Sequence, residues 1–306
     1  MKPRFALIGA NGYLAKHVAK ELFRLHYDDT ILIDIHPPAL FESATHLEWD
    51  VREKNESIID AIKDCGYIFF FAGLTGTVQS IDQYSDFIGT NEIGLLNLLE
   101  PLRRHGLMGK VIFPSTRLVY KGKKDALLKE DDEKECRTIY AMNKLACETY
   151  LRIYYECFGT RYTVFRICVP YGNTLGQSLS YGSIRHFFSR AREKENVIVY
   201  GEGLQRRTFT HVSDIARIVV SGSLDERTDN GVFNIGGPDH LAIVDIARRI
   251  ANKYGVGVDF RDWTPLDSKT ESGDTMFDSS KLNSIVPPVY EFAFDQWINS
   301  NPDAGQ

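Results

Sequence analysis

Continuous apolar, β-branched runs alternate with helical patterns through the first half of this 306-residue chain. Strands that are apolar along their whole length are buried on both faces, as in a parallel sheet covered by helices. The alternation therefore predicts an α/β fold built on a doubly wound parallel sheet. The expected strands are 4–9, 30–35, 46–50, 67–73, 110–116 and 162–168, and the expected helices are 11–26, 55–64, 83–105 and 139–158.

The regular alternation ends at about residue 169. Shorter strands and helices follow with frequent glycines between them, so we expect a smaller, irregular α/β lobe packed on the first. The expected elements there are strands at 197–201 and 232–237 and helices near 182–194, 213–222 and 242–255.

The charge and the apolar runs of the chain exclude several classes of partner. The net charge is -5 at pH 7, the pI is about 5.9, and no dense block of lysine and arginine occurs. These values argue against a surface for nucleic acid or for anionic membranes. No run approaches about 18 consecutive apolar residues, so we expect no membrane-spanning segment.

The five cysteines show no pairing pattern. They are odd in number and include no Cys-x-x-Cys pair, which fits buried, reduced thiols better than disulfides or zinc ligands. The amino-terminal stretch has too few apolar residues for a signal peptide. We therefore expect a cytoplasmic protein without a metal site.

A glycine-rich turn, GANGYLA at residues 9–15, follows the first expected strand and opens the first helix. Gly9 and Gly12 allow a tight turn and a close approach to a pyrophosphate, whose charge the helix amino terminus stabilises. Ala15 stands where a third glycine is usual. Two glycines alone fit a plain tight turn as well as a dinucleotide site.

Asp34 ends the second expected strand, 25 residues after Gly9. A carboxylate there can accept hydrogen bonds from an adenosine ribose and repels a 2'-phosphate. No arginine or lysine follows until Arg52, so the pattern favours NAD over NADP. The alternative is an ordinary surface aspartate at a strand end. Asp50, after the third strand, fits the adenine edge or plain solvent about equally.

Tyr140 and Lys144 stand four residues apart in the helical pattern after the fifth strand. Such residues share one face of a helix, so a phenol and an ammonium can reach one ligand. Spacing alone is not decisive, because Tyr120 and Lys124 share it within a charged, turn-like stretch. Thr116 ends the fifth strand, at the edge of the sheet where ligands bind.

These side chains suit the oxidation of an alcohol. Hydride removal from a C–H bond requires removal of the proton from the adjoining hydroxyl, and a free phenol has a pKa of about 10. A nearby ammonium favours the phenolate and lowers that pKa toward a working range. Thr116 would orient the reacting oxygen.

In this order the motifs resemble those of the extended short-chain dehydrogenases/reductases, the NAD-dependent sugar-nucleotide epimerase/dehydratase family. The similarity spans about residues 3–285. Further matches are Ala72 and Gly73 after the fourth strand, Asn91 on the following helix, and the stretches 166–172 and 205–216.

The resemblance implies a Rossmann domain for NAD at 1–168, joined by 213–240, and a mainly substrate-binding lobe at 169–306. It makes Tyr140 the acid/base, Lys144 the ligand of the nicotinamide ribose, and Thr116 the ligand of the reacting sugar oxygen. Arg207 would grip the diphosphate of a nucleotide sugar. The implied NAD-binding residues are Gly9, Asn11, Gly12, Tyr13, Leu14, Asp34, Asp50, Val51, Ala72, Gly73, Asn91, Tyr140 and Lys144.

Four positions depart from the family pattern. Val169 replaces an asparagine that often touches the substrate, and Glu271 stands where an arginine often helps to hold the phosphate. Arg117 and Leu118 follow Thr116, where 4,6-dehydratases carry Asp-Glu, so dehydration is not expected. His211 lies in a strand-like stretch and is expected to be structural.

The resemblance and the NAD preference together indicate a nucleotide-sugar epimerase, acting at C4 through a transient keto-sugar. A one-way 4-dehydrogenase or 4-ketoreductase with the same three residues is the main alternative. A non-catalytic cofactor-sensing regulator is less favoured, because such proteins lack the tyrosine and lysine. A homodimer is implied by the family, through helices near 83–105 and 139–158 whose apolar residues include Leu95, Leu98 and Leu99.

Overall fold

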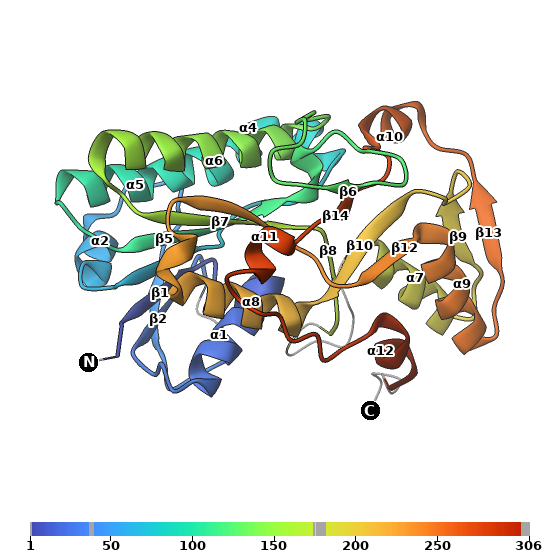
Figure 1. The fold of residues 1–306 in the computed structure, drawn as a ribbon, viewed down its shortest axis with the longest axis horizontal. Coiled ribbons are helices and arrows are strands. Elements are labelled where there is room, and N and C mark those ends of the chain that lie inside the picture. Colours follow the sequence, from blue (N-terminus) through green and yellow to red (C-terminus); the bar gives the residue numbers. More distant parts are fainter. Residues whose placement is uncertain (1, 37–39, 174, 176–181, 301–306) are drawn as a thin grey trace.

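Seven parallel strands form the centre of the structure (Figure 1). The computed structural model describes residues 2–36, 40–173, 175 and 182–300. The strand order is β11-β7-β5-β4-β1-β2-β3, which confirms the predicted doubly wound sheet. The strands are β1 (Phe5–Ile8), β2 (Thr30–Asp34), β3 (Thr45–Glu48), β4 (Tyr67–Phe70), β5 (Lys110–Thr116), β7 (Tyr162–Ile167) and β11 (Gly231–Ile235).

Helices cover both faces of this sheet, and successive strand residues point alternately into two cores. Ala6 and Ile8 of β1 pack in one core, whereas Phe5 and Leu7 pack in the other. Both cores exclude water, as the continuous apolar strands predict. The first core is covered by α2 (Glu56–Ile62), α5 (Gly94–Arg104) and α6 (Ile139–Phe158), the second by α1 (Tyr13–Arg24) and α8 (Val212–Leu224).

The strand order reverses between β1 and β4, because β2 follows on one side of β1 and β4 lies on the other. In open parallel sheets, ligands bind beyond the carboxyl ends of the strands at this point. The glycine-rich turn after β1 and the segment after β4 meet there. A Cβ atom on Gly9 would lie 2.6 Å from the Cα of Ala72.

The predicted helix at 83–105 is divided into several pieces. It consists of α4 (Tyr84–Phe87), the π-helix η1 (Ile88–Ile93) and α5, and the short α3 (Gln79–Asp82) lies directly before it. The wide π turn contains Asn91, whose side chain binds the backbone of Leu74 after β4. The apolar periodicity of the sequence predicts helix over this stretch but does not resolve its local winding.

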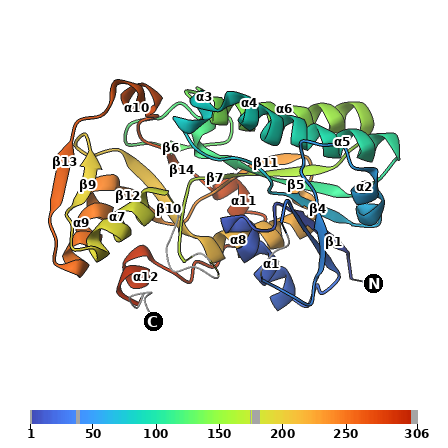
Figure 2. The ribbon, with the colours of Figure 1, turned by 180° about the vertical axis from the view of Figure 1, so that it is seen from behind.

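The second lobe lies beside the carboxyl-terminal edge of the sheet (Figures 1 and 2). Its core gathers large aromatic side chains, among them Tyr171, Phe188, Phe209 and Trp297. The expected strand at 232–237 is β11 and belongs to the large sheet. The lobe contains β8 (Val169–Tyr171), α7 (Gly182–Arg192), β9 (Val197–Tyr200), β10 (Arg206–His211), β12 (Asp239–Ala242), α9 (Ile243–Tyr254), β13 (Val258–Arg261), α10 (Pro265–Thr270) and α12 (Phe294–Ser300).

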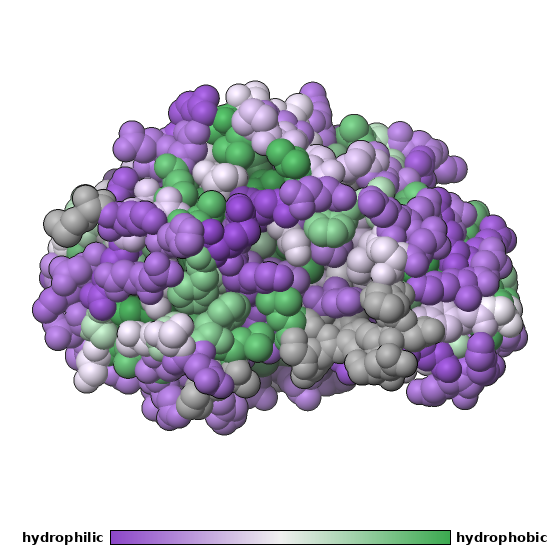
Figure 3. Space-filling model, turned by 90° about the horizontal axis from the view of Figure 1, so that it is seen from below, coloured by the Kyte–Doolittle hydropathy of each residue, from purple (hydrophilic) through white to green (hydrophobic). Residues whose placement is uncertain are grey.

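The remaining short elements lie in the segments between the longer helices and strands. They are η2 (Arg117–Val119), β6 (Leu127–Leu128), η3 (Glu226–Thr228), β14 (Met276–Phe277) and α11 (Ser280–Asn283), with β6 and β14 pairing in parallel. On the face seen from below, hydrophilic residues predominate around a smaller apolar area (Figure 3). Within the described part of the chain, no helix is long and apolar enough to cross a membrane.

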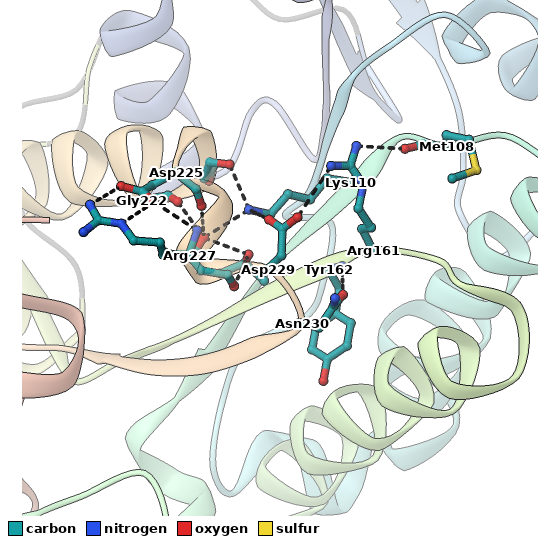
Figure 4. Close-up of polar contacts among 12 residues, drawn as sticks. Met108, Lys110, Arg161, Tyr162, Gly222, Asp225, Arg227, Asp229 and Asn230 are labelled. Atoms are coloured by element: carbon teal, nitrogen blue, oxygen red, sulfur yellow. Dashed lines mark hydrogen bonds and ion pairs between the residues drawn. The ribbon is translucent and has the colours of Figure 1, made fainter. Parts of the chain in front are cut away.

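A buried lysine closes the amino-terminal end of β5, opposite the ligand edge (Figure 4). Lys110 is 1% exposed, and its ammonium donates to the Ser223 carbonyl and the Thr228 hydroxyl, each at 3.0 Å. It also forms an ion pair of 2.5 Å with Asp229. These bonds tie the turn before β11 to β5, so the last strand of the sheet is fixed by an internal polar cluster.

Candidate active site

The glycine-rich turn leaves open backbone at the amino terminus of α1. Gly9 has a φ of 84°, and a side chain there would collide with Phe71 and Ala72. Gly12 is the N-cap residue of α1 and has no side chain to satisfy the first amide groups. Free amide groups at a helix amino terminus bind phosphate. The cradle formed by this turn and these amide groups fits the pyrophosphate of a dinucleotide.

Asp34 is held next to this turn by backbone donors. Its carboxylate accepts hydrogen bonds of 2.8 Å from the amide of Asn11 and of 2.8 Å from the amide of Ile35. The Asn11 side chain in turn donates to the His36 carbonyl at 2.9 Å. A carboxylate oxygen has two lone pairs, so these two bonds fix the group and leave acceptor capacity for ribose hydroxyls.

Asp50 and Val51 have other contacts in this structure. The Asp50 carboxylate binds Arg52 through two guanidinium nitrogens, at 3.0 and 2.5 Å, and these bonds lower the pKa of Asp50. Val51 is buried, and its carbonyl accepts a 2.8 Å bond from Asn97. Of the two interpretations of Asp50, this geometry favours the solvated ion pair over the adenine contact.

The segment after β4 is shaped by Asn91. Its side chain accepts a 2.7 Å hydrogen bond from the Leu74 amide and donates to the Leu74 carbonyl at 3.1 Å. Both functional atoms of the amide are thereby used. Asn91 thus fixes the backbone directly after Ala72 and Gly73, and beyond these two bonds its amide has one further N–H and one further oxygen lone pair.

Tyr13 and Leu14 begin α1 and hold it in place. The Tyr13 hydroxyl donates to the Gly172 carbonyl at 2.8 Å, across to the second lobe. Leu14 packs against the second core.

His211 caps α8 by accepting a bond from the Ser213 amide, and its ring packs against Tyr171. His211 therefore has the structural setting expected from its strand-like surroundings.

Thr116, Tyr140 and Lys144 come from two packed elements. Thr116 ends β5 and is 7% exposed, and its hydroxyl accepts a bond from the Leu118 amide. Tyr140 is the second residue of α6, which begins after the capping side chain of Thr138. Since α6 contacts both β5 and η2, the helix lies along the strand that carries Thr116.

The ammonium of Lys144 is held in an apolar setting. Lys144 is 5% exposed, and its Nζ lies 4.4 Å from the centroid of the Phe113 ring. A Cβ on Gly73 would lie 3.8 Å from the same Nζ, so the lysine reaches the segment after β4. Burial lowers the pKa of Lys144 to about 8. A desolvated cation acts strongly on a neighbouring phenol, because water does not screen it.

Arg207 points into the second lobe and is already paired. It is 2% exposed, and its guanidinium donates to the Glu271 carboxylate, to the Gly273 carbonyl and, at 2.9 Å, to the Arg206 carbonyl. Glu271, which stands where the family often has an arginine, therefore pairs with Arg207. The carboxylate occupies the arginine that the resemblance assigns to the diphosphate.

Arg117 is a site residue that the sequence reasoning missed. It follows Thr116, and its Nη1 donates to the Ser272 and Thr275 hydroxyls at 3.0 and 3.2 Å. Burial and the neighbouring Arg207 lower the pKa of this guanidinium to about 10. Among the residues that the structure describes, no carboxylate lies within ion-pair distance of it. The only sequence signal is its place directly after Thr116, the predicted ligand of the reacting oxygen.

Two cavities lie in or near the cleft. One of about 70 Å³ lies between the lobes, with Arg117 and Leu118 on one side and Asp267, Glu271 and Ser272 on the other. A more open one of about 750 Å³ is lined only by residues of the second lobe, including Leu204 and Phe260. The small cavity adjoins the predicted catalytic residues through Arg117.

No cluster of acidic, histidine and cysteine side chains suited to a metal ion occurs within the described ranges.

The family model of the NAD-dependent epimerases and dehydratases matches residues 6–236 of the chain. The chain belongs to the NAD-dependent epimerase/dehydratase family. NAD is accordingly the cofactor of this epimerase/dehydratase family enzyme, and the cradle at Gly9 and the fixed carboxylate of Asp34 fit it. The predicted family and cofactor are thus confirmed.

Curated relatives of this family member share modest identity with it. The UDP-N-acetyl-α-D-glucosaminuronate decarboxylase of Bacillus cytotoxicus is 29% identical over 264 residues, covering 82% of this chain and 80% of the relative. A putative UDP-glucose 4-epimerase of Methanocaldococcus jannaschii is 23% identical over 256 residues, covering 81% of each. Relatives with different reactions therefore match the same length of chain.

Solved structures reproduce the whole fold of this family member. The UDP-glucuronic acid 4-epimerase of Bacillus cereus, in complex with UDP-glucuronic acid and NAD, has a TM-score of 0.85 at 21% identity, covering 97% of both chains. The UDP-glucose 4-epimerase of Thermotoga maritima, with UDP-glucose, has a TM-score of 0.85 at 21% identity, covering 96% of both. At this identity the likeness establishes the fold.

Proposed function

We propose that the protein is an NAD-dependent nucleotide-sugar epimerase that acts at C4. The observation that carries the proposal is the desolvated Lys144 on the same helix face as Tyr140, beside the strand that ends in Thr116. A phenol that must give and take a proton at neutral pH needs a strong local cation to lower its pKa. The cofactor preference inferred from Asp34 supports an enzyme that recycles bound NAD.

In this mechanism NAD, when bound, accepts a hydride from the sugar and returns it. The protein's own groups handle the proton and the geometry. Tyr140 removes the proton from the C4 hydroxyl and later donates it back, while Lys144 stabilises the phenolate and holds the cofactor ribose. Thr116 orients the reacting oxygen. The cleft between the lobes must let the keto-sugar turn over, so that the hydride would return to the opposite face of C4.

A one-way 4-dehydrogenase or 4-ketoreductase is the second candidate, because it requires the same Thr116, Tyr140 and Lys144. A panel of nucleotide sugars separates the candidates when NADH absorbance, product stereochemistry and carbon dioxide release are followed together. An epimerase gives the C4 epimer without net NADH. Stoichiometric NADH without an epimer supports the dehydrogenase, and carbon dioxide release would indicate a decarboxylase like the Bacillus cytotoxicus relative.

We also propose a homodimer formed through η1 and α6. Leu95, Leu98 and Leu99 are fully buried in the first core, so they pack within the subunit. The same helical layer nevertheless exposes apolar side chains, including Ile88 (38%) and Ile153 (43%). Ile153→Glu should shift the mass measured by light scattering from dimer to monomer. Leu204→Glu, at an exposed position on the second lobe, is the matched control and should leave the mass unchanged.

A further inference from the structure

Arg117 and Arg207 donate to alternate residues of one short segment in the cleft. Arg207 binds Glu271 and Gly273, whereas Arg117 binds Ser272 and Thr275. The two guanidinium groups thus approach the segment from different lobes, since Arg117 belongs to η2 after the central sheet and Arg207 to β10. Arg117 directly follows Thr116 in the chain.

Neither carboxylate of this cluster pairs with Arg117. Glu271 binds Arg207 and the Gly273 amide, whereas Asp267, which also lines the cavity, binds the Thr264 hydroxyl. Arg117 has only neutral hydroxyl partners among the described residues. A desolvated cation beside a like charge is costly unless an anion compensates it. The cluster therefore favours an anionic ligand.

The same cluster also contains an obstacle to a large anion. The cavity at Arg117 holds about 70 Å³, room for about two water molecules at about 30 Å³ each. A diphosphate needs more space, and its two negative charges would meet the carboxylate of Glu271. It can reach both guanidinium groups only if Glu271 leaves Arg207.

We propose that Arg117 is a ligand of the substrate's diphosphate and that Glu271 is a resident anion which the diphosphate displaces from Arg207. This inference rests on the proposed function for the presence of a diphosphate. It assigns to Arg117 the second positive charge of the anion site, which residue 271 does not supply in this chain. It also makes Glu271 a residue that weakens binding and thereby sets how tightly the nucleotide is held.

The test uses the NAD-loaded protein and calorimetric binding of nucleotides. UDP, dTDP and GDP are screened first, and the tightest one is compared with its own monophosphate. Arg117→Gln should weaken binding of the nucleoside diphosphate by about tenfold or more, as for loss of a charged hydrogen bond. Arg117→Lys should restore part of the loss, because the charge returns. Glu271→Gln should tighten binding of the nucleoside diphosphate by about fivefold, because the carboxylate that competes for Arg207 is removed.

Two matched variants control for charge alone. Asp267→Asn removes a carboxylate from the same cavity that pairs with neither arginine, and Arg137→Gln removes an exposed arginine that donates to the Glu271 carbonyl. Each should change diphosphate affinity by less than about twofold. Unchanged NAD affinity and melting temperature in every variant show that the protein is folded.

The proposal is overturned if Arg117→Gln leaves diphosphate affinity unchanged, if Glu271→Gln weakens it, or if no nucleoside diphosphate binds the loaded protein. Comparison of UDP-glucuronate with UDP-glucose provides a further arm. If Arg117→Gln lost affinity for UDP-glucuronate but not for UDP-glucose, Arg117 would be a ligand of a sugar carboxylate. That result would also overturn the diphosphate assignment. Failure of the proposed function looks different: the nucleotides bind as expected, but no sugar in the panel is epimerised, oxidised or reduced.

Discussion

The ammonium of Lys144 lies 4.4 Å from the centroid of the Phe113 ring, where burial lowers its pKa to about 8. This relationship joins α6 to β5, the strand that ends in Thr116. It also creates a conflict between stability and catalysis, because a buried cation destabilises the folded chain while it activates the phenol.

Lys144→Met should stabilise the apoprotein near neutral pH and abolish turnover. Below about pH 8 both folded and unfolded chains keep the lysine proton, so the folded state bears the full cost of burial. Between about pH 8 and 10.5 the folded state loses the proton first, and the free energy of unfolding rises through that window. The cost near neutral pH is about 3 kcal/mol.

Denaturant unfolding of the apoprotein from neutral pH to about pH 10 checks this prediction. The gap between wild type and Lys144→Met should narrow as the pH rises. The control Lys20→Met changes an exposed lysine on α1 and should show no such convergence. A constant gap across the window would contradict the assigned burial cost.

Tyr140→Phe should reduce turnover by about a hundredfold or more and leave NAD affinity within about threefold, because only the proton-transfer group is lost. Steady-state kinetics and cofactor titration measure the two effects. Tyr155→Phe removes a hydroxyl from a 40% exposed tyrosine on the same helix and should leave turnover unchanged. Equal turnover in the Tyr140 variant would remove this residue from the chemistry.

Asp34→Asn should weaken NAD binding by about tenfold or more, since a neutral amide accepts weaker hydrogen bonds from the ribose. Fluorescence titration with NAD and NADP measures the affinity and the preference together, and the preference for NAD should fall. Asp50→Asn is the comparison, because the Asp50 carboxylate is already bound to Arg52. A larger loss of affinity for Asp50→Asn would show that its ion pair opens toward the adenine.

Gly9→Ala should destabilise the protein and weaken NAD strongly, because the new methyl group would lie 2.6 Å from the Cα of Ala72 at a φ of 84°. The melting temperature and the NAD affinity are the measurements. Gly106→Ala separates backbone strain from collision: its φ is 64° and nothing lies within 4 Å of the added Cβ. That control should cost only about 1 kcal/mol and leave NAD binding intact.

Lys110→Met should lower the free energy of unfolding by about 1 to 2 kcal/mol, because the buried Ser223 carbonyl and Thr228 hydroxyl lose their donor while Arg161 still pairs with Asp229. Turnover of the folded enzyme should not change, since Lys110 and Thr116 lie at opposite ends of β5. The exposed pair of Lys121 and Glu133 provides the control, and Lys121→Met should cost about 0.5 kcal/mol or less. Denaturant titration distinguishes the two.

The sequence predicted the parts of the protein that depend on local pattern. Strands buried on both faces appear as unbroken apolar runs, and the glycine turn, Asp34, Thr116 and the Tyr140–Lys144 pair each follow from their place at the end of a strand or on a helix. The central sheet is confirmed strand by strand within a few residues. Periodicity and strand ends are encoded locally, so they can be recognised without coordinates.

Other features depended on contacts between distant segments. Asn91 binds Leu74 on a π turn, Leu95 packs within the subunit, and Arg117 binds Ser272. None of these partners follows from composition or spacing.

The sheet, the cofactor turn and the proposed trio of Thr116, Tyr140 and Lys144 could be predicted from the sequence, whereas only the folded chain shows which charges meet in the cleft between the lobes. Arg207 and Glu271 are 64 residues apart and meet only because β10 and the segment after α10 pack together. Arg117 reaches that segment from the other lobe. Ion pairs form wherever packing brings charges together and excludes water, and no local pattern records which charges those will be.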